Sequence, residues 1–147
     1  MMGRVRRTGR RHKGLIAALV LDSPVLNWTE VIKTNCAHSG LPAAVGYLAA
    51  PWLTIGPLAR LAGLPDRIPL RSFDWTARAA GLTTPTLILH GKRDDSVPIP
   101  LSQALRDARP ELVELETFDA GHTLAWNTDS DRWHETVTTW LRSRVPR

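Results

Sequence analysis

Three short apolar runs are spaced along the chain, and each predicts a strand. Residues 16–22 and 86–90 are almost continuously apolar, and each run is followed by a Ser-Pro pair or a glycine. A run that is apolar on both faces indicates a strand buried on both faces, as in a parallel sheet. Residues 112–118 instead alternate apolar side chains with Glu114 and Glu116, which predicts an edge strand with one face in water.

Helical patterns fill the chain between the first two runs. Residues 41–53 are apolar and small, and we expect Pro51 to break that helix. Residues 57–63 predict a short helical turn. Residues 73–80 predict a helix, because an aspartate near the start and a glycine after the end are typical helix-end signals. All three segments belong to a long Pro- and Trp-containing excursion, residues 25–80, for which we expect a lid-like role.

Two further helices are predicted after the second run. Residues 101–108 have apolar side chains at helical spacing before Pro110. Residues 130–144 have an acid in the first turn and arginines in the last, which suits the helix dipole. Their apolar face consists of Trp133, Val137, Trp140 and Leu141. The order strand, helices, strand, helix, strand, helix predicts an α/β fold with about three parallel strands and right-handed crossovers.

Composition agrees with one globular domain of this class. The 147 residues are 43% hydrophobic and 22% charged, which argues against collagen-like, disordered and multipass membrane proteins. No apolar run approaches the roughly 18 residues of a membrane-spanning helix. The single cysteine, Cys36, excludes an internal disulfide framework and a multi-cysteine zinc site. We expect no cofactor and no metal, and a cytoplasmic location.

The positive charge of the chain is concentrated at its N-terminus. Residues 1–13 hold six Lys or Arg and no acid, whereas the other 134 residues hold 13 basic and 14 acidic side chains. Nucleic-acid binders usually spread basic charge over a folded face, so nucleic-acid binding is not expected. We interpret residues 1–13 as a disordered basic arm and residues 14–147 as the folded domain.

Candidate chemistry follows the last two predicted strands. Ligands bind at the carboxyl ends of the strands in open parallel sheets, and residues 22–24, 90–98 and 119–123 lie there. Asp94 lies four residues after one strand and His122 four residues after the next. Adjacent strands lie about 4.8 Å apart, so the two loops can bring the carboxylate to the imidazole. Such a pair fixes the tautomer of the histidine and frees its other ring nitrogen to take a proton from a nucleophile.

Several segments resemble the α/β-hydrolase fold. Residues 85–98 (PTLILHGKRDDSVP) and 118–122 (FDAGH) look like the closing segment of that family. Residues 19–28 (LVLDSPVLNW) are similar to its strand after the nucleophile helix, and residues 125–133 (AWNTDSDRW) to the start of its last helix. The resemblance covers about residues 15–144, and it is closest to bacterial serine hydrolases of the esterase and peptidase type.

The resemblance implies a role for each polar residue of these loops. Asp94 would be the triad acid and His122 the triad base. Asp95 is the neighbouring alternative for the acid, but the family places that residue four positions after the histidine of a His-Gly pair, here His90. His90 itself is expected to be a structural residue at the strand end. The implied substrate is a small-molecule ester or a peptide.

The nucleophile of this family is missing from the sequence. The family places it in Gly-x-Ser-x-Gly, and none of the seven serines has glycine at both positions −2 and +2. Cys36 has no such frame either. The chain therefore resembles the C-terminal half of a hydrolase. Because its triad is incomplete, we expect no turnover by the chain alone.

Two alternative functions stay open. The chain could be a non-catalytic binding module whose basic arm docks an acidic partner, or a truncated reading frame of a full hydrolase. If the chain is truncated, residues 16–22 would lack a neighbouring strand on one side, which predicts poor solubility, self-association through that strand, or assembly with a missing N-terminal half. Trp28, Trp52 and Trp75 would either pack in the core or line an apolar acyl pocket.

Overall fold

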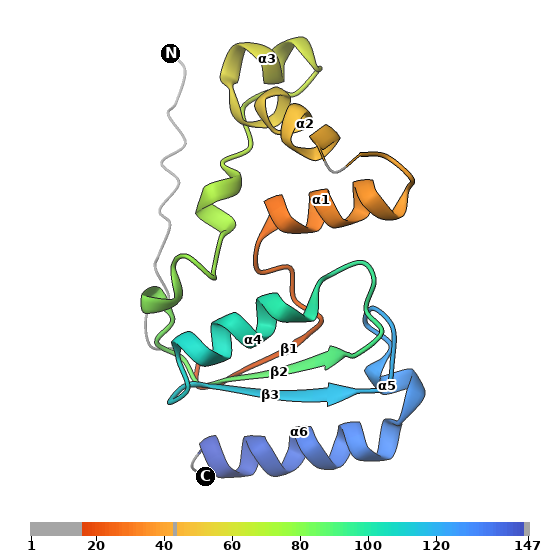
Figure 1. Ribbon diagram of the computed structural model, residues 1–147. Coiled ribbons are helices and arrows are strands. Elements are labelled where there is room, and N and C mark those ends of the chain that lie inside the picture. Colours follow the sequence, from red (N-terminus) through yellow and green to blue (C-terminus); the bar gives the residue numbers. More distant parts are fainter. Residues whose placement is uncertain (1–15, 43, 146–147) are drawn as a thin grey trace, which may run out of the picture.

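The computed structural model describes residues 16–42 and 44–145 and contains a three-stranded parallel sheet (Figure 1). The strands are β1 (Leu19–Asp22), β2 (Thr86–Gly91) and β3 (Val113–Phe118), in the order β1-β2-β3. Both pairings are parallel, so the carboxyl ends of the strands share one edge of the sheet. The prediction of an α/β fold with about three parallel strands is confirmed, while the basic arm lies outside the described residues.

The three strands differ in burial according to their place in the sheet. β2 is central, and all of its residues are buried. β3 is an edge strand in which two exposed glutamates alternate with less exposed side chains, as predicted. β1 is the other edge and is only half-buried, which corrects the prediction of burial on both faces. Ile16 is 56% exposed and the strand begins at Leu19, because β1 has one neighbouring strand among the described residues.

Helices α4 (Ile99–Ala108) and α6 (Ser130–Arg144) cover opposite faces of the sheet (Figure 1). On the α4 side, Ile88 of β2 packs in a buried cluster with Leu105 of the helix. The cluster on the α6 side consists of Leu87, Leu89, Phe118, Ala120, Ala125, Val137 and Trp140. Because the side chains of β2 alternate between the two clusters, this strand joins both layers of the core.

Helix α6 forms at the predicted residues because its end signals agree. The Asp129 carboxylate accepts from the Arg132 N–H at 3.1 Å as the N-cap, and Asp131 lies in the first turn. Trp140 is buried, and its indole Nε1 donates to the Glu114 carboxylate at 2.9 Å. The predicted apolar face of this helix therefore packs against the sheet.

The excursion begins with α1 (Trp28–His38), a helix that the sequence analysis did not predict. The Asn27 side chain caps it by accepting from the Glu30 N–H at 3.1 Å. Val31 is the one fully buried residue of the helix, so its apolar periodicity is weak. The available signal was the Asn27–Glu30 spacing, which is typical of a capping box.

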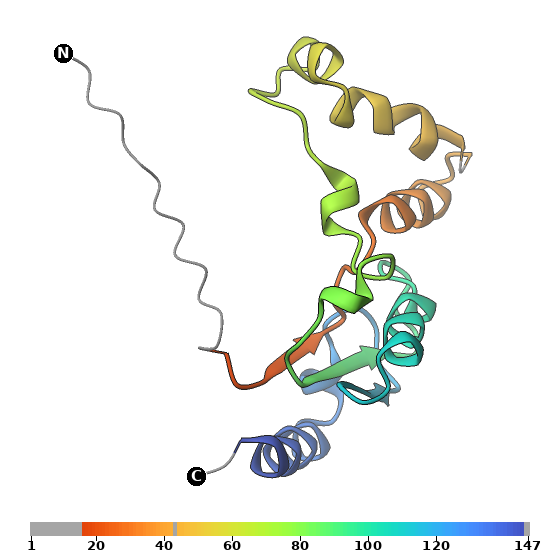
Figure 2. The same cartoon turned by 90° about the vertical axis from the view of Figure 1, so that its left-hand side faces the viewer.

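Helices α2 (Ala44–Thr54) and α3 (Gly56–Leu61) project away from the sheet (Figures 1 and 2). Pro51 lies inside α2 without ending it, which corrects the predicted break. Proline removes the hydrogen bond to the carbonyl of residue i−4. Here that residue is Tyr47, which is exposed, so water can bind the freed carbonyl. No helix in the described part of the chain has the length and apolarity needed to span a membrane.

The prediction of a helix over residues 73–80 is wrong. The segment connects two short 3-10 helices, η1 (Leu70–Phe73) and η2 (Ala79–Gly81). Between them the Asp74 carboxylate accepts from the Ala77 N–H at 3.0 Å. Local side-chain bonds of this kind compete with helix formation, so the aspartate that suggested a helix start stabilises a turn instead.

Candidate functional site

The loops that follow β2 and β3 meet at the carboxyl edge of the sheet. The Lys92 N–H donates to the Phe118 carbonyl at 2.7 Å, and the Arg93 N–H donates to the Ala120 carbonyl at 3.0 Å. Gly91 permits this approach, because a Cβ at that position would lie 2.3 Å from the Ala120 carbonyl oxygen. Backbone contacts therefore join the two loops independently of any functional side chain.

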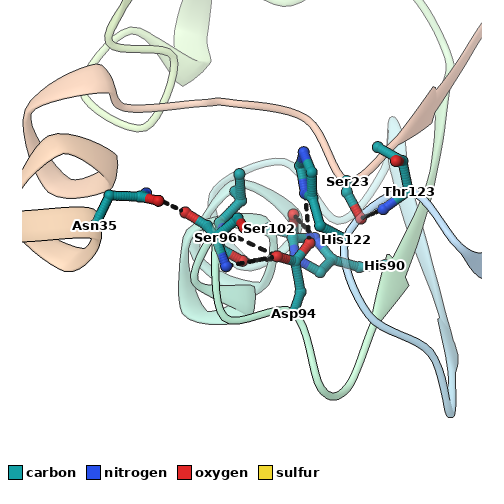
Figure 3. Close-up of polar contacts among 9 residues, drawn as sticks. Ser23, Asn35, His90, Asp94, Ser96, Ser102, His122 and Thr123 are labelled. Carbon is teal, nitrogen blue, oxygen red and sulfur yellow. Dashed lines mark hydrogen bonds and ion pairs between the residues drawn. The ribbon is translucent and has the colours of Figure 1, made fainter. Parts of the chain in front are cut away.

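Asp94 and His122, the two predicted site residues, contact each other across these loops (Figure 3). His122 Nδ1 lies 2.9 Å from Asp94 Oδ2, and the Asp94 side chain is fully buried while that of His122 is 37% exposed. Because the carboxylate accepts a hydrogen bond from the Nδ1–H group, Nε2 of the neutral imidazole has no proton. The neighbouring Asp95 is exposed, so the preference for Asp94 as the partner of His122 agrees with the geometry.

Asp94 is also held by donors from its own loop. Its Oδ1 accepts from the Ser96 N–H at 3.1 Å and from the Val97 N–H at 2.8 Å. Burial alone would raise the pKa of Asp94, but its hydrogen bonds, led by the one from Val97, hold the pKa below its usual value. The carboxylate is therefore ionised at neutral pH and directed at the imidazole.

His90 lies fully buried at the end of β2. Its Nε2 is 3.0 Å from the Val97 carbonyl and its Nδ1 is 2.8 Å from Ser102 Oγ on α4. A carbonyl can only accept, so Nε2 bears the proton and Nδ1 accepts from the Ser102 hydroxyl. Nε2 also lies 3.4 Å from Asp94 Oδ2. These contacts tie the Asp94 loop to α4, which supports the structural role expected for His90.

Two residues of these strand-end segments, for which no role was predicted, border the pair. Ser23 follows β1 and Thr123 follows His122, and their φ angles are 45° and 53°. Among the residues described, only these two non-glycine residues adopt a left-handed backbone. The Thr123 N–H donates to the Oγ of the buried Ser23 at 3.3 Å. Strained backbone is concentrated at functional sites. The one sequence feature that could have indicated this turn is the Ser-Pro pair after the strand.

Asp22, the last residue of β1, adds a second carboxylate, for which no role was predicted either. Its pKa is raised, chiefly because burial disfavours the charged form; the Asp94 charge adds to this, and the two histidines oppose it. Oδ1 of Asp22 is buried and has no hydrogen-bond partner among the described residues. No group of three or more His, Cys, Asp or Glu side chains within the described ranges is arranged to hold a metal ion.

The excursion reaches the site through α1. Asn35 Nδ2 donates to the Ser96 carbonyl at 2.8 Å (Figure 3). It also donates to the Val31 carbonyl of its own helix at 2.8 Å. Ser96 belongs to the loop that contains Asp94 and is one of the donors to its carboxylate. The excursion is therefore connected directly to the loop that positions the acid.

The three tryptophans of the excursion do not pack in the core. Trp28, Trp52 and Trp75 are 43%, 45% and 39% exposed, so the core alternative is wrong for all of them. Trp75 lines an apolar cavity of about 270 Å³ that it shares with Leu19 and Leu21 of β1. By contrast, Trp140 is buried and Trp133 is partly buried, on the apolar face of α6.

Comparison with known proteins identifies the fold. No protein-family model matches the chain, and no curated protein sequence matches it. Two crystal forms of the Pyrococcus furiosus esterase Pf2001 match it with a TM-score of 0.60, at 17% and 18% sequence identity. The match covers 89% of this chain but 45% and 46% of the esterase, so the chain spans less than half the length of that protein. The described residues have a partial α/β-hydrolase fold, as predicted from the sequence.

Proposed function

We propose that Asp94 and His122 are the acid and the base of a serine-hydrolase-type site for carboxylic esters or amides. The observation that supports this most is the 2.9 Å contact between His122 Nδ1 and the buried Asp94 carboxylate. A carboxylate on one ring nitrogen fixes the tautomer of a catalytic histidine and stabilises the imidazolium that forms during proton transfer. The partial hydrolase fold agrees with this assignment.

The two residues have separate tasks in this proposal. His122 Nε2 takes the proton of an attacking hydroxyl while the hydroxyl oxygen bonds to the substrate carbonyl carbon, and it then gives that proton to the leaving group. Asp94 remains ionised because its pKa is lowered, so it can balance the charge of the protonated ring. The partial exposure of His122 leaves the ring accessible to both the hydroxyl and the substrate.

The attacking hydroxyl comes, in this proposal, from outside the described residues. Ser23 lies on a strained turn beside the pair, but it is 3% exposed and its Oγ accepts from the Thr123 N–H. No serine of the sequence lies in Gly-x-Ser-x-Gly. Because triad members act as a unit, the chain alone should not turn over substrate.

The proposed substrate class rests on the structural likeness to an esterase. Both matched structures are of a protein named as an esterase, which favours an ester over an amide. The loops around His122 do not distinguish one ester from another. We therefore propose small carboxylic esters as the first substrates to test.

Nitrogen NMR of His122 in the full chain tests the acid–base pair directly. At neutral pH we expect a protonated Nδ1 and an unprotonated Nε2. In Asp94→Asn the fixed tautomer should be lost, because an amide can donate as well as accept. The matched control is Asp95→Asn, next in sequence but exposed, which should leave the spectrum unchanged. A protonated Nε2 in the wild type, or no effect of Asp94→Asn, would overturn the proposal.

Ester hydrolysis tests the dependence on an outside nucleophile. The purified full chain and its His122→Ala variant are compared on p-nitrophenyl acetate, and we expect both to match the rate in buffer. Turnover that His122→Ala abolishes would show that a nucleophile within the chain had been overlooked. That result would contradict the incomplete triad while retaining His122 as the base.

A further inference from the structure

The peptide group that joins Ser96 to Val97 lies between helix α1 and Asp94. Its N–H group, which belongs to Val97, donates to Asp94 Oδ1 at 2.8 Å. Its carbonyl, which belongs to Ser96, accepts from Asn35 Nδ2 at 2.8 Å (Figure 3). Because a trans peptide group is planar, its C=O and N–H bonds point in opposite directions and can only turn together. A hydrogen bond on the carbonyl therefore also sets the direction of the N–H that faces the carboxylate.

This N–H group is a principal support of the Asp94 carboxylate. Burial raises the pKa of Asp94, and the hydrogen bond from Val97 is the strongest of the contacts that lower it. The other carboxylate oxygen, Oδ2, lies 2.9 Å from His122 Nδ1. A peptide group whose carbonyl accepts a hydrogen bond is polarised, so its N–H becomes a stronger donor. The contacts thus form one chain from Asn35 through the peptide group and the carboxylate to the imidazole.

The Asn35 side chain is suited to hold this peptide group. Its Nδ2 lies 2.8 Å from the Val31 carbonyl and 2.8 Å from the Ser96 carbonyl. Carbonyl oxygens only accept hydrogen bonds, so each takes one of the two amide hydrogens. The bond to Val31 fixes the side chain to its own helix, and the bond to Ser96 then fixes the peptide group to that helix. Asn35 is exposed, so replacing its side chain should leave the protein folded.

Helix α1 is in turn fixed to other parts of the excursion. The Asn27 side chain, which caps the helix, donates to Asp74 Oδ2 at 3.1 Å. On α2, the centroid of the Tyr47 ring lies 4.7 Å from the Lys33 ammonium nitrogen, within the range of a cation–π contact. The bond from Asn35 therefore connects the Asp94 loop to a helix that other segments of the excursion hold in place.

We propose that Asn35 is a positioning residue that keeps Asp94 directed at His122 through the intervening peptide group. This role rests on the proposed function of the pair, and it gives the excursion a task beyond that of a lid. The pair is aligned for proton transfer when α1 is seated against the Asp94 loop, and it loosens when α1 moves away. Asn35 therefore couples the position of the excursion to the alignment of the base.

The exchange of the His122 Nδ1 proton with water, measured by NMR on the full chain, tests this role. In Asn35→Leu the side chain has a similar size but no donor. In Asn35→Ser the hydroxyl can still bond to the Val31 carbonyl one turn earlier, but it is too short to reach Ser96. We expect both variants to exchange this proton at least about twofold faster than the wild type, the low end of the change that one net hydrogen bond produces in an equilibrium.

Two controls separate positioning from a general loss of structure. Asn127→Leu makes the same change at an exposed asparagine of helix α5 (Ala125–Thr128), and it should leave the exchange of the Nδ1 proton unchanged. The backbone amides of β2 should also exchange at the wild-type rate in both Asn35 variants. If these amides speed up as much as the Nδ1 proton does, general loosening explains the result and the positioning role is wrong.

Asp94→Asn distinguishes a failure of this role from a failure of the proposed function. If Asp94→Asn speeds the exchange of the Nδ1 proton and neither Asn35 variant does, Asn35 has no positioning role and the acid–base pair stands. If Asp94→Asn leaves the exchange unchanged as well, or if the wild type has no protected Nδ1 proton, the pair itself is wrong.

Discussion

The sheet layer and the 25–80 excursion bury their apolar side chains to very different extents. Every residue of β2 is buried between α4 and α6, whereas Leu48 and Leu61 of the excursion are 71% and 75% exposed. Hydrophobic burial stabilises structure in proportion to the apolar area removed from water. The sheet layer therefore supplies most of the hydrophobic stabilisation of the fold. Asp94 and His122 both lie on loops of this layer, and the excursion contacts the loop that contains Asp94.

The largest expected effect comes from removing the same side chain in each region. Leu89→Ala deletes a fully buried side chain of β2 and should lower the free energy of unfolding by about 2–5 kcal/mol. Leu61→Ala is the matched variant in α3, and because Leu61 is exposed, the change should stay within about 0.5 kcal/mol. Urea denaturation of both variants measures the difference. Equal losses would mean that the exposed side chains of the excursion are covered in solution.

A second pair of variants tests the close approach of the site loops. In Gly91→Ala the new Cβ would lie 2.3 Å from one backbone carbonyl oxygen and 2.5 Å from another, so the loop before His122 has to move. We expect a loss of about 1–3 kcal/mol in unfolding free energy together with a shifted His122 NMR signal. Gly81→Ala, with no atom within 4 Å of the new Cβ, should change stability little. An unshifted His122 signal in Gly91→Ala would show that the loops are not coupled there.

The smallest expected effect concerns Asp22, where the sheet layer meets the excursion. Its pKa in the folded protein is raised above the ordinary value of 3.8, so the folded state holds the proton more tightly than the unfolded state does. Stability is therefore lost as the pH rises through the folded pKa, and it is regained as the pH falls. Asp22→Asn should stabilise the protein by on the order of 1 kcal/mol at pH 7, with partial exposure limiting the gain.

Urea denaturation at a series of pH values checks the sign of this effect. The gain from Asp22→Asn should vanish below about pH 3.8, where the wild-type carboxyl is protonated in both states. Glu135→Gln is a control at an exposed carboxyl of α6, outside the site. A gain that does not change with pH would mean that packing, rather than the buried charge, explains the result.

The elements that were predicted correctly have strong local signals in the sequence. Residues 86–90 are apolar on both faces because β2 lies between two helices, and residues 130–144 combine an apolar face with charges suited to both helix ends. The predictions that failed involve local signals with two meanings. An aspartate at position 74 can start a helix or a turn, and Pro51 can end a helix or lie exposed inside one.

The acid and base of the candidate site belong to the predictable part. Asp94 and His122 each lie four residues after a predicted strand, and parallel strands end at the same edge of a sheet. Sequence therefore indicated the contact, although its catalytic role remains a prediction. Asp22 and Ser23 were placed at the same end of the sheet but were given no role, because Asp-Ser-Pro after a strand resembles an ordinary strand end. What makes them notable is that Asp22 has a buried oxygen without a hydrogen-bond partner in the described part of the chain, and that Ser23 has a left-handed backbone.

Local sequence patterns were sufficient to predict the strands, the last helix and the contact between residues 94 and 122, because hydrophobic periodicity and strand-end signals extend over only a few positions. The hydrogen bond between positions 23 and 123 depended on folding, because it joins residues 100 apart whose backbone angles no local preference favours. The same holds for the half-burial of β1, because its edge position was expected only from the resemblance to a longer hydrolase and not from its own residues. A strand buried on both faces and one at a sheet edge can have the same apolar sequence, and only the arrangement of neighbouring strands distinguishes them.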